Sequence, residues 1–199
     1  MVLYSHIVDP VGHCVRMVLS EKDISCDIRY VYGDERPQEV AEVNPYDTVL
    51  TLTDRDLALY DAQIIMEYLD ERFPHPPLMP VDPVTRANNR QIRYRIMRDL
   101  YALLSDLDQG SGSQVTSARK QMRDHLTALT PAFSQTAFFM SDEFSLVDCT
   151  FAPLLWRLDY YGVKLPATAK AVVRYAQRIF DRPGFRGSLS DQEVQLHGL

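Results

Sequence analysis

The sequence predicts an α+β protein in which a small mixed unit of strands and helices precedes an all-helical unit. Up to about residue 73, short apolar runs with strand periodicity alternate with amphipathic helical segments. After residue 83 the apolar residues keep helical spacing throughout. A proline-rich stretch at 74–80 separates the two patterns and cannot continue either a helix or a central strand. Segregation of strands and helices in this way is typical of the α+β class.

The first third of the chain is expected to fold in the order β-α-β-α-β-β-α. Residues 26–30 alternate between apolar and charged side chains, which is the period of a strand. Asp54-Arg55-Asp56 form a tight polar turn between two short strands, and Asp61 suits the N-cap of a helix that stops at Pro74. In chain order the expected elements are a strand at 2–4, a helix at 11–22, a strand at 26–30, a helical turn near 37–43, a hairpin of strands at 49–52 and 57–60, and the helix after Asp61.

The second part of the chain is expected to be helical. Ser145 and Asp148 have the spacing of a capping box at the start of an apolar helix. The expected helices span about 84–109, 116–129, 146–158 and 167–180, with a flexible loop at 109–113 and a polar tail after Pro183. The predicted domains are therefore 1–76, a proline-rich linker at 77–84, and 85–199.

Composition excludes several classes of function. With 46% hydrophobic and 24% charged residues, the chain can bury a core as an ordinary globular protein does. Its net charge of −6 argues against autonomous nucleic-acid binding, which needs a basic surface. No apolar run approaches a membrane span, and the first residues lack a secretory pattern. Three separated cysteines indicate reduced thiols, so we expect a cytoplasmic protein.

The proline-rich stretch is the most informative segment. Four of the seven residues from Pro74 to Pro80 are prolines, so much of this backbone is already ordered. An ordered segment costs a binding partner little entropy, and His75 adds a polar side chain to it. Two interpretations are open: a rigid linker between domains, or a recognition surface.

Longer motifs indicate a family. The β-α-β-α-β-β-α pattern followed by helices resembles the glutathione transferase fold, whose N-terminal domain is thioredoxin-like. The capping box at 145–148 stands where that fold begins its central helix. Two strings, at 66–80 and 140–158, resemble the stringent starvation protein A family, and the resemblance covers essentially the whole chain.

The resemblance implies a non-enzymatic transcription regulator without a cofactor. Members of the family are implied to be homodimers that bind RNA polymerase holoenzyme through its sigma factor during starvation, stationary phase and acid stress. The Pro-His-Pro motif, here Pro74, His75 and Pro76, is implied to be the functional surface, and we include the adjacent Pro77 in it. A scaffold dimer with a different protein partner is the alternative within the same class.

A glutathione-dependent transferase or reductase is the alternative from another class, and the sequence argues against it. Asp9 stands where related enzymes place a group that stabilises the thiolate, and a carboxylate would repel that charge. Leu50 stands where the fold usually carries a cis-proline, so we expect a rebuilt trans loop. Asp61 keeps the acidic residue of the γ-glutamyl site, but Ala62 replaces its hydroxyl. These four positions are interpreted as vestigial.

Other chemistry-bearing residues support no site. His6, Asp9 and His13 lack the spacing of metal ligands, so no metal is expected. Cys14 lies well inside the first helix, which favours a packed cysteine over a reactive one.

The arginines of the long helix are a candidate interface. Arg86, Arg90 and Arg93 recur at helical spacing, which fits either a solvated face or a dimer or polymerase interface. In a homodimer the complementary charge was expected from the helix before the linker, at Glu67, Asp70 and Glu71.

Overall fold

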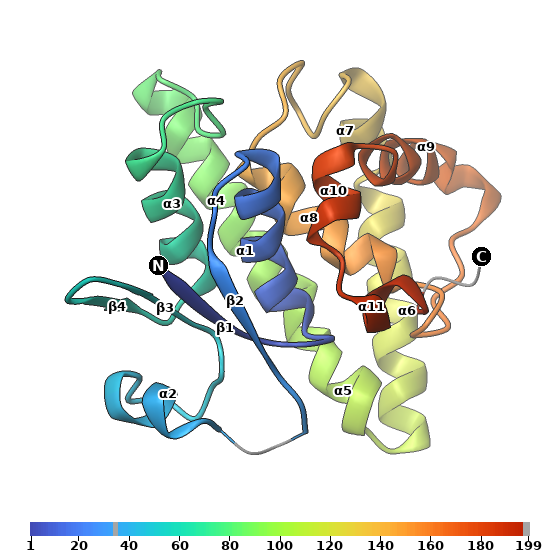
Figure 1. Ribbon diagram of the computed structural model, residues 1–199. Helices are drawn as coiled ribbons and strands as arrows, with labels where there is room; N and C mark the ends of the chain where they lie inside the picture. The colour runs from blue at the N-terminus through green and yellow to red at the C-terminus, as the bar shows by residue number, and fades with distance from the viewer. Residues whose placement is uncertain (34–35, 197–199) are drawn as a thin grey trace. The chain divides into compact units, whose positions relative to one another are not determined.

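The computed structural model describes residues 1–33 and 36–196, which form two compact units (Figure 1). The first unit contains residues 1–77 together with 183–194, and the second contains residues 78–182 together with 195–196. This division differs from the predicted domains at the C-terminal end, where 183–194 join the first unit. The α+β class and the order of a thioredoxin-like unit followed by a helical one are confirmed.

The first unit is built on a four-stranded mixed sheet with the strand order β2-β1-β3-β4. Leu3 at the centre of β1 pairs with Ile28 of parallel β2 and with Leu52 of antiparallel β3. Leu3 and Leu52 are almost completely buried, as expected for central strands covered by helices. The strands are β1 (Val2–His6), β2 (Asp27–Val31), β3 (Thr51–Asp54) and β4 (Leu57–Leu59).

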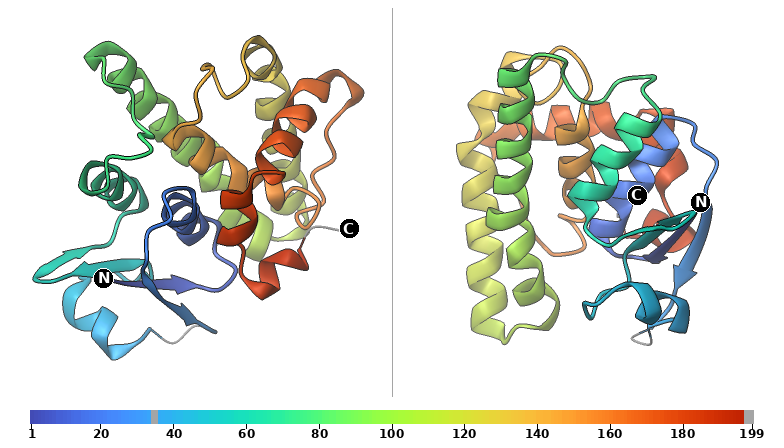
Figure 2. Two further views of the ribbon diagram at one scale, coloured as in Figure 1. Left: turned by 45° about the horizontal axis from the view of Figure 1, so that its top comes forward. Right: turned by 90° about the vertical axis from the view of Figure 1, so that its left-hand side faces the viewer.

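Three helices accompany the sheet. Figure 2 shows α1 (Pro10–Glu21) and α3 (Ala62–Arg72) on one face and α2 (Gln38–Val43) beside the other. Helix α1 is buried along most of its length, because Cys14, Val15, Val18 and Leu19 recur on the faces that meet the sheet and α3. All elements expected in this part of the chain are present, with shifts of one or two residues at their ends.

The C-terminal segment returns to α1, which the polar tail of the sequence did not predict. Helices α10 (Pro183–Ser188) and α11 (Asp191–Val194) lie beside α1 (Figure 1). Arg16 Nη1 and Nη2 of α1 each donate at 2.7 Å to a carboxylate oxygen of Glu193, and both residues are buried. The charged side chains of the tail are therefore partly core residues, paired in a geometry that sequence spacing does not reveal.

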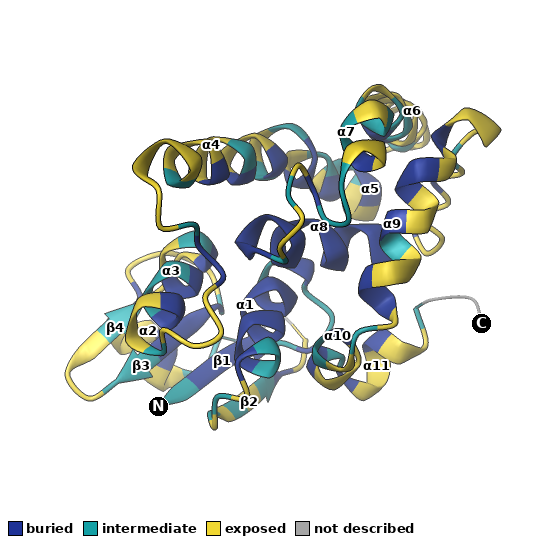
Figure 3. Ribbon diagram, turned by 90° about the horizontal axis from the view of Figure 1, so that it is seen from above, coloured by how far each residue is buried: buried dark blue, intermediate teal, exposed yellow. Residues whose placement is uncertain are grey.

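The second unit is helical, with α8 at its centre. Every residue of α8 (Leu146–Trp156) is buried, and Figure 3 shows this helix dark blue throughout. Its capping box is confirmed: Ser145 N donates to Asp148 Oδ2 at 2.8 Å, and Val147 N donates to Ser145 Oγ at 3.2 Å. The other elements are α4 (Pro83–Asp99), η1 (Tyr101–Leu103), α5 (Leu104–Gln109), α6 (Gly112–Ala128), α7 (Thr130–Gln135), η2 (Ala167–Ala169) and α9 (Lys170–Phe180).

Two expectations for this unit were wrong, and one helix was missed. The single helix expected to reach residue 109 is interrupted at Leu100, where a 3-10 turn separates α4 from α5. The expected flexible loop at 109–113 is a short junction, because Ser111 and Gln114 form a capping box that starts α6. Helix α7, at 130–135, was not expected. Among the described residues, no helix is long and apolar enough to cross a membrane.

Candidate functional site

The proline segment, residues 74–77, is exposed at all four positions. It follows the C-cap of α3 at Phe73 and precedes Leu78 and Met79, which are buried. The peptide bond between His75 and Pro76 is cis. Three prolines and an imidazole therefore face solvent on a backbone that is anchored immediately before and after them.

On the side of the first unit, Lys22 anchors the segment. Lys22 is the C-cap residue of α1, and its Nζ donates to the carbonyl oxygen of Pro76. The same Nζ lies 2.8 Å from Asp70 Oδ1, and both side chains are nearly inaccessible to solvent. A buried ammonium group satisfied by a carboxylate and a carbonyl holds the backbone of the segment in one place.

On the side of the second unit, two buried residues hold the chain after the segment. The carbonyl oxygen of Leu78 accepts from Leu146 N at 3.0 Å, at the start of α8. Met79 Sδ lies 4.0 Å from Arg93 Nη2, and Arg93 Nε donates to Asn89 Oδ1 at 2.9 Å. Arg93 is only 2% exposed, so its assignment to a candidate interface was wrong. The helical spacing predicted that the guanidinium of Arg93 would lie on the surface, but it packs inside the second unit beside Met79, which follows the proline segment.

A surface hollow of about 420 Å³ adjoins the segment within the first unit. It is lined by the turn at 22–25, which follows α1, and by residues 72–75. Arg72 at its edge pairs with Asp54 at 2.9 Å and stacks on the ring of Phe73, with 5.6 Å from the guanidinium carbon to the ring centroid. The hydroxyl of Tyr68 and the guanidinium of Arg72 hold the pKa of Asp54 below its usual range. The end of α3 is thus fixed just before the exposed prolines.

The remaining interface candidates differ in exposure. Arg90 is exposed and Arg86 is half-buried on α4. Of the acidic residues expected to complement them, Glu71 is exposed, whereas Asp70 is buried against Lys22. Asp70 therefore serves the linker and is not available for contact with another molecule.

At two of the four positions interpreted as vestigial, the side chain caps a helix of this chain. Asp9 accepts from Val11 N at 3.1 Å and from Gly12 N at 2.7 Å, so its carboxylate caps α1. Asp61 caps α3 in the same way, accepting from Gln63 N at 2.9 Å and from Ile64 N at 3.0 Å. A helix N-terminus attracts anions through these free N–H groups. Here both sets of donors already have an anionic partner.

The loop before β3 is also closed. Leu50 and Ala62 are buried, and no cis bond besides that at Pro76 occurs in residues 1–33 and 36–196, so the bond before Leu50 is trans. Asn44 Nδ2 donates at 3.1 Å to the hydroxyls of Thr48 and Thr51, which ties the two ends of this loop together. The backbone is thus stabilised from within.

The other candidates have structural contacts. Cys14 is buried, with Sγ 3.3 Å from the carbonyl oxygen of Pro10. His13 is buried, and its Nε2 lies 2.8 Å from Ser188 Oγ. The described part of the chain contains no group of three or more side chains that could hold a metal ion.

Sequence analysis missed Lys22 and the turn that follows it. Lys22 reads as an ordinary basic residue at a helix end, and its partner Pro76 lies 54 positions further on. No local pattern connects the two residues, although a basic residue at the end of a helix that precedes a strand is a position worth testing.

Comparisons with known proteins agree with this architecture. Residues 5–77 match the N-terminal domain family of glutathione S-transferases, and residues 92–183 match the C-terminal domain family. A stringent starvation protein A homolog of Coxiella burnetii is 45% identical over 98% of this chain and 94% of that protein. A second, from Histophilus somni, is 46% identical over 96% of this chain and 91% of that protein. A delta-class glutathione transferase of Nilaparvata lugens has the same fold, with a TM-score of 0.87 at 20% identity over 98% and 96% of the two chains.

Proposed function

The chain belongs to the stringent starvation protein A family within the glutathione transferase superfamily, and from that premise we propose that it regulates transcription by binding a protein partner, without catalysis. The observation that carries the proposal is the exposed proline segment 74–77, in which the carbonyl oxygen of Pro76 accepts from buried Lys22. A surface that is exposed and already ordered binds a partner at a low entropic cost.

The partner that we propose is RNA polymerase holoenzyme, engaged through its sigma factor, in a cytoplasmic protein that acts under starvation, stationary-phase or acid stress. The relatives that share 44–46% identity are named stringent starvation protein A homologs. The net charge of −6 supports a protein partner, because an acidic chain repels the phosphate backbone of nucleic acid.

We propose that the active form is a homodimer, and an apolar patch in the first unit supports this. Leu57 of β4, Ile64 of α3 and Tyr60 between these two elements are exposed, Ile64 by 58%. Exposed Tyr46 extends the patch, with its ring centroid 5.5 Å from that of Tyr60. Contiguous exposed apolar groups mark interaction surfaces. Ile64→Asp should therefore reduce the mass measured by light scattering to the 22.9 kDa of one chain, whereas Val173→Asp, at an exposed valine of α9, should not.

Glutathione chemistry is the alternative that we propose to exclude. Four positions would contact the tripeptide. The carboxylates at two of them, Asp9 and Asp61, already cap helices, and the side chains at the other two, Leu50 and Ala62, are buried and apolar. Calorimetric titration should show no binding stronger than about 1 mM, or −4.1 kcal/mol. Tighter binding, or turnover of an aromatic electrophile, would reverse the assignment.

The decisive experiment changes the segment without changing the core. Variants His75→Ala and Pro74→Ala/Pro77→Ala remove exposed groups, so the loss in unfolding free energy should be about 1 kcal/mol or less. Capture by immobilised holoenzyme should weaken about tenfold or more, since each tenfold is only about 1.4 kcal/mol. Pro166→Ala changes another exposed proline and serves as the matched control. Folded variants that are captured as tightly as the parent would return the segment to the role of a linker.

A further inference from the structure

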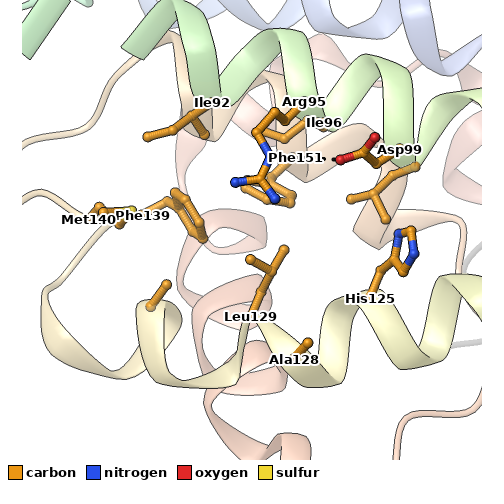
Figure 4. Close-up of a pocket in the computed structure, with 12 residues that line it drawn as sticks. Ile92, Arg95, Ile96, Asp99, His125, Ala128, Leu129, Phe139, Met140 and Phe151 are labelled. Carbon is orange, nitrogen blue, oxygen red and sulfur yellow. Dashed lines mark ion pairs between the residues drawn. The ribbon is translucent and has the colours of Figure 1, made fainter. Parts of the chain in front are cut away.

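A second feature of interest lies entirely within the helical unit. A pocket of about 290 Å³ opens between α4 and the end of α6, with Phe139 and Met140 closing one side (Figure 4). Ile96, Leu129, Phe139 and Phe151 form its apolar walls. The volume lies at the small end of ligand sites, which span roughly 300–1,000 Å³.

The pocket is open for an identifiable reason. Ala128 at the end of α6 and Ala132 in α7 line the pocket with side chains too short to fill the space. The wall behind is firm, because the ring of Phe139 packs 4.8 Å from Phe133 and 4.7 Å from Phe151, measured between centroids. Aromatic rings packed at these distances hold one another in place, so the walls do not readily collapse inward.

The mouth of the pocket carries charge. Figure 4 shows the guanidinium of Arg95 pointing into the space between α4 and α6, with His125 on the facing helix. Arg95 Nε lies 3.8 Å from Asp99 Oδ2, which is beyond hydrogen-bonding distance, and both side chains are substantially exposed. A loose exposed ion pair of this kind contributes little, so the guanidinium can exchange Asp99 for a better placed anion.

We propose that this pocket binds a small monocarboxylate with an aromatic or short aliphatic body. The apolar body would lie against Phe139, Phe151 and Leu129. The carboxylate would accept from Arg95, whose planar fork matches carboxylate geometry, with His125 as a second donor. Exposed Met140 stands at the mouth, where its flexible thioether can adapt to ligands of different shape.

The site is independent of the proposed partner surfaces. None of the residues that line the pocket belongs to the proline segment 74–77 or to the apolar patch around Ile64, and Arg90 of α4 is not among them either. Occupation of the pocket can therefore be measured without reference to polymerase binding, and failure of one proposal leaves the other intact.

The test uses the full chain with 4-phenylbutyrate and its neutral analogue 4-phenylbutanol, titrated by calorimetry and by amide chemical shifts. The parent should bind the carboxylate with a Kd below about 1 mM and the alcohol about tenfold more weakly. Arg95→Gln should remove that difference while leaving the alcohol unaffected. Arg98→Gln is the matched control, because Arg98 bonds to Tyr94 outside the pocket. Ala132→Phe should fill the space and abolish binding of both probes.

Three results would overturn the proposal. They are absence of carboxylate binding to the parent, equal losses for Arg95→Gln and Arg98→Gln, and unchanged binding by folded Ala132→Phe. Should Ala132→Phe fail to fold, the shifts that the carboxylate induces in the parent decide the location. They should gather at 92–99 and 125–140, and shifts confined to other residues would refute the site.

Discussion

The two ends of helix α1 differ in what they leave for another molecule. At its N-terminal end, Asp9 engages the N–H groups of Val11 and Gly12, and nothing remains to attract an anion. At its C-terminal end, Lys22 binds Asp70 and the carbonyl oxygen of Pro76, and the adjacent prolines face solvent. At the first end the N–H groups of Val11 and Gly12 are bonded within the chain, whereas at the second end exposed prolines lie on an ordered backbone.

This difference teaches how a ligand-binding fold can serve a different purpose. A site that binds a small anion needs unsatisfied donors, and one carboxylate at a helix N-terminus is enough to satisfy them. A protein-binding surface needs exposed groups on a backbone that does not move. In this chain the buried ion pair of Lys22 holds the backbone at Pro76, and Asp9 occupies the free donors at the opposite end of the same helix.

The largest effect is expected at the C-terminal end of α1, where Lys22 holds the backbone at Pro76. Lys22→Met leaves Asp70 buried without a cation and Pro76 without its donor, which should cost about 3–5 kcal/mol of unfolding free energy. Urea denaturation gives this value, and hydrogen exchange at residues 78–79 reports whether the chain after the prolines becomes mobile.

A double variant separates the ion pair from the anchor. Lys22→Met/Asp70→Leu removes both charges, so most of the lost stability should return. Pro76 would still lack its donor, and capture by holoenzyme should remain weaker than for the parent. Full recovery of both stability and capture would mean that Lys22 acts on the fold alone.

The second prediction concerns the N-terminal end of α1, where the carboxylate of Asp9 caps the helix. Asp9→Ala removes the cap of α1 and should cost about 1 kcal/mol, within the usual range of about 0.5–2. The N–H groups of Val11 and Gly12 lose their carboxylate partner and should then attract anions. A glutathione site should still not form, because Leu50 and Ala62 are unchanged. Thermal unfolding measures the first result and calorimetry the second. Glutathione binding by Asp9→Ala below about 1 mM would show that Asp9 alone had closed the site.

Much of this fold could be predicted because its signals are local. The alternation at 26–30, the cap at Asp61 and the capping box at Ser145 each depend on neighbours within a few residues, and the structure confirms all three. The interruption at Leu100 was missed, because the apolar spacing continues across it and only packing decides where the helix breaks.

The parts that could not be predicted depend on contacts between distant residues. Arg93 has the spacing of a surface arginine, yet it is buried, and its guanidinium lies 4.0 Å from the thioether of Met79, 14 residues earlier in the chain. Glu193 lies in a segment whose composition is polar, yet its side chain is buried because it pairs with Arg16. In each case a charged side chain is buried because a specific partner exists, and its sequence neighbourhood carries no trace of that partner.

The smallest effect is expected from Tyr68 of α3. Its substitution tests whether the contacts of α3 with Asp54 also help to hold the proline segment. Tyr68 donates to Asp54 Oδ2 at 2.6 Å, and Arg72 pairs with the same carboxylate just before the prolines. Tyr68→Phe removes the hydroxyl and should cost about 0.5–1.5 kcal/mol at neutral pH. Because Arg72 and Lys22 still hold the chain, capture by holoenzyme should change less than it does for Lys22→Met.

The pH dependence of Tyr68→Phe identifies its cause. In the folded protein the hydrogen bond from Tyr68 is the first cause of the lowered pKa of Asp54. The ionised carboxylate therefore stabilises the fold above about pH 4, and this contribution is lost as the pH falls through the lowered pKa. The difference in unfolding free energy between the parent and Tyr68→Phe should be constant near neutrality and shrink below about pH 4. Urea denaturation at a series of pH values measures it, with Tyr94→Phe, an exposed tyrosine of α4, as control. A difference that persists unchanged into acid would assign the loss to packing of the ring, and the end of α3 would then be held by Arg72 and by the Lys22–Asp70 pair without a contribution from the Tyr68 hydroxyl.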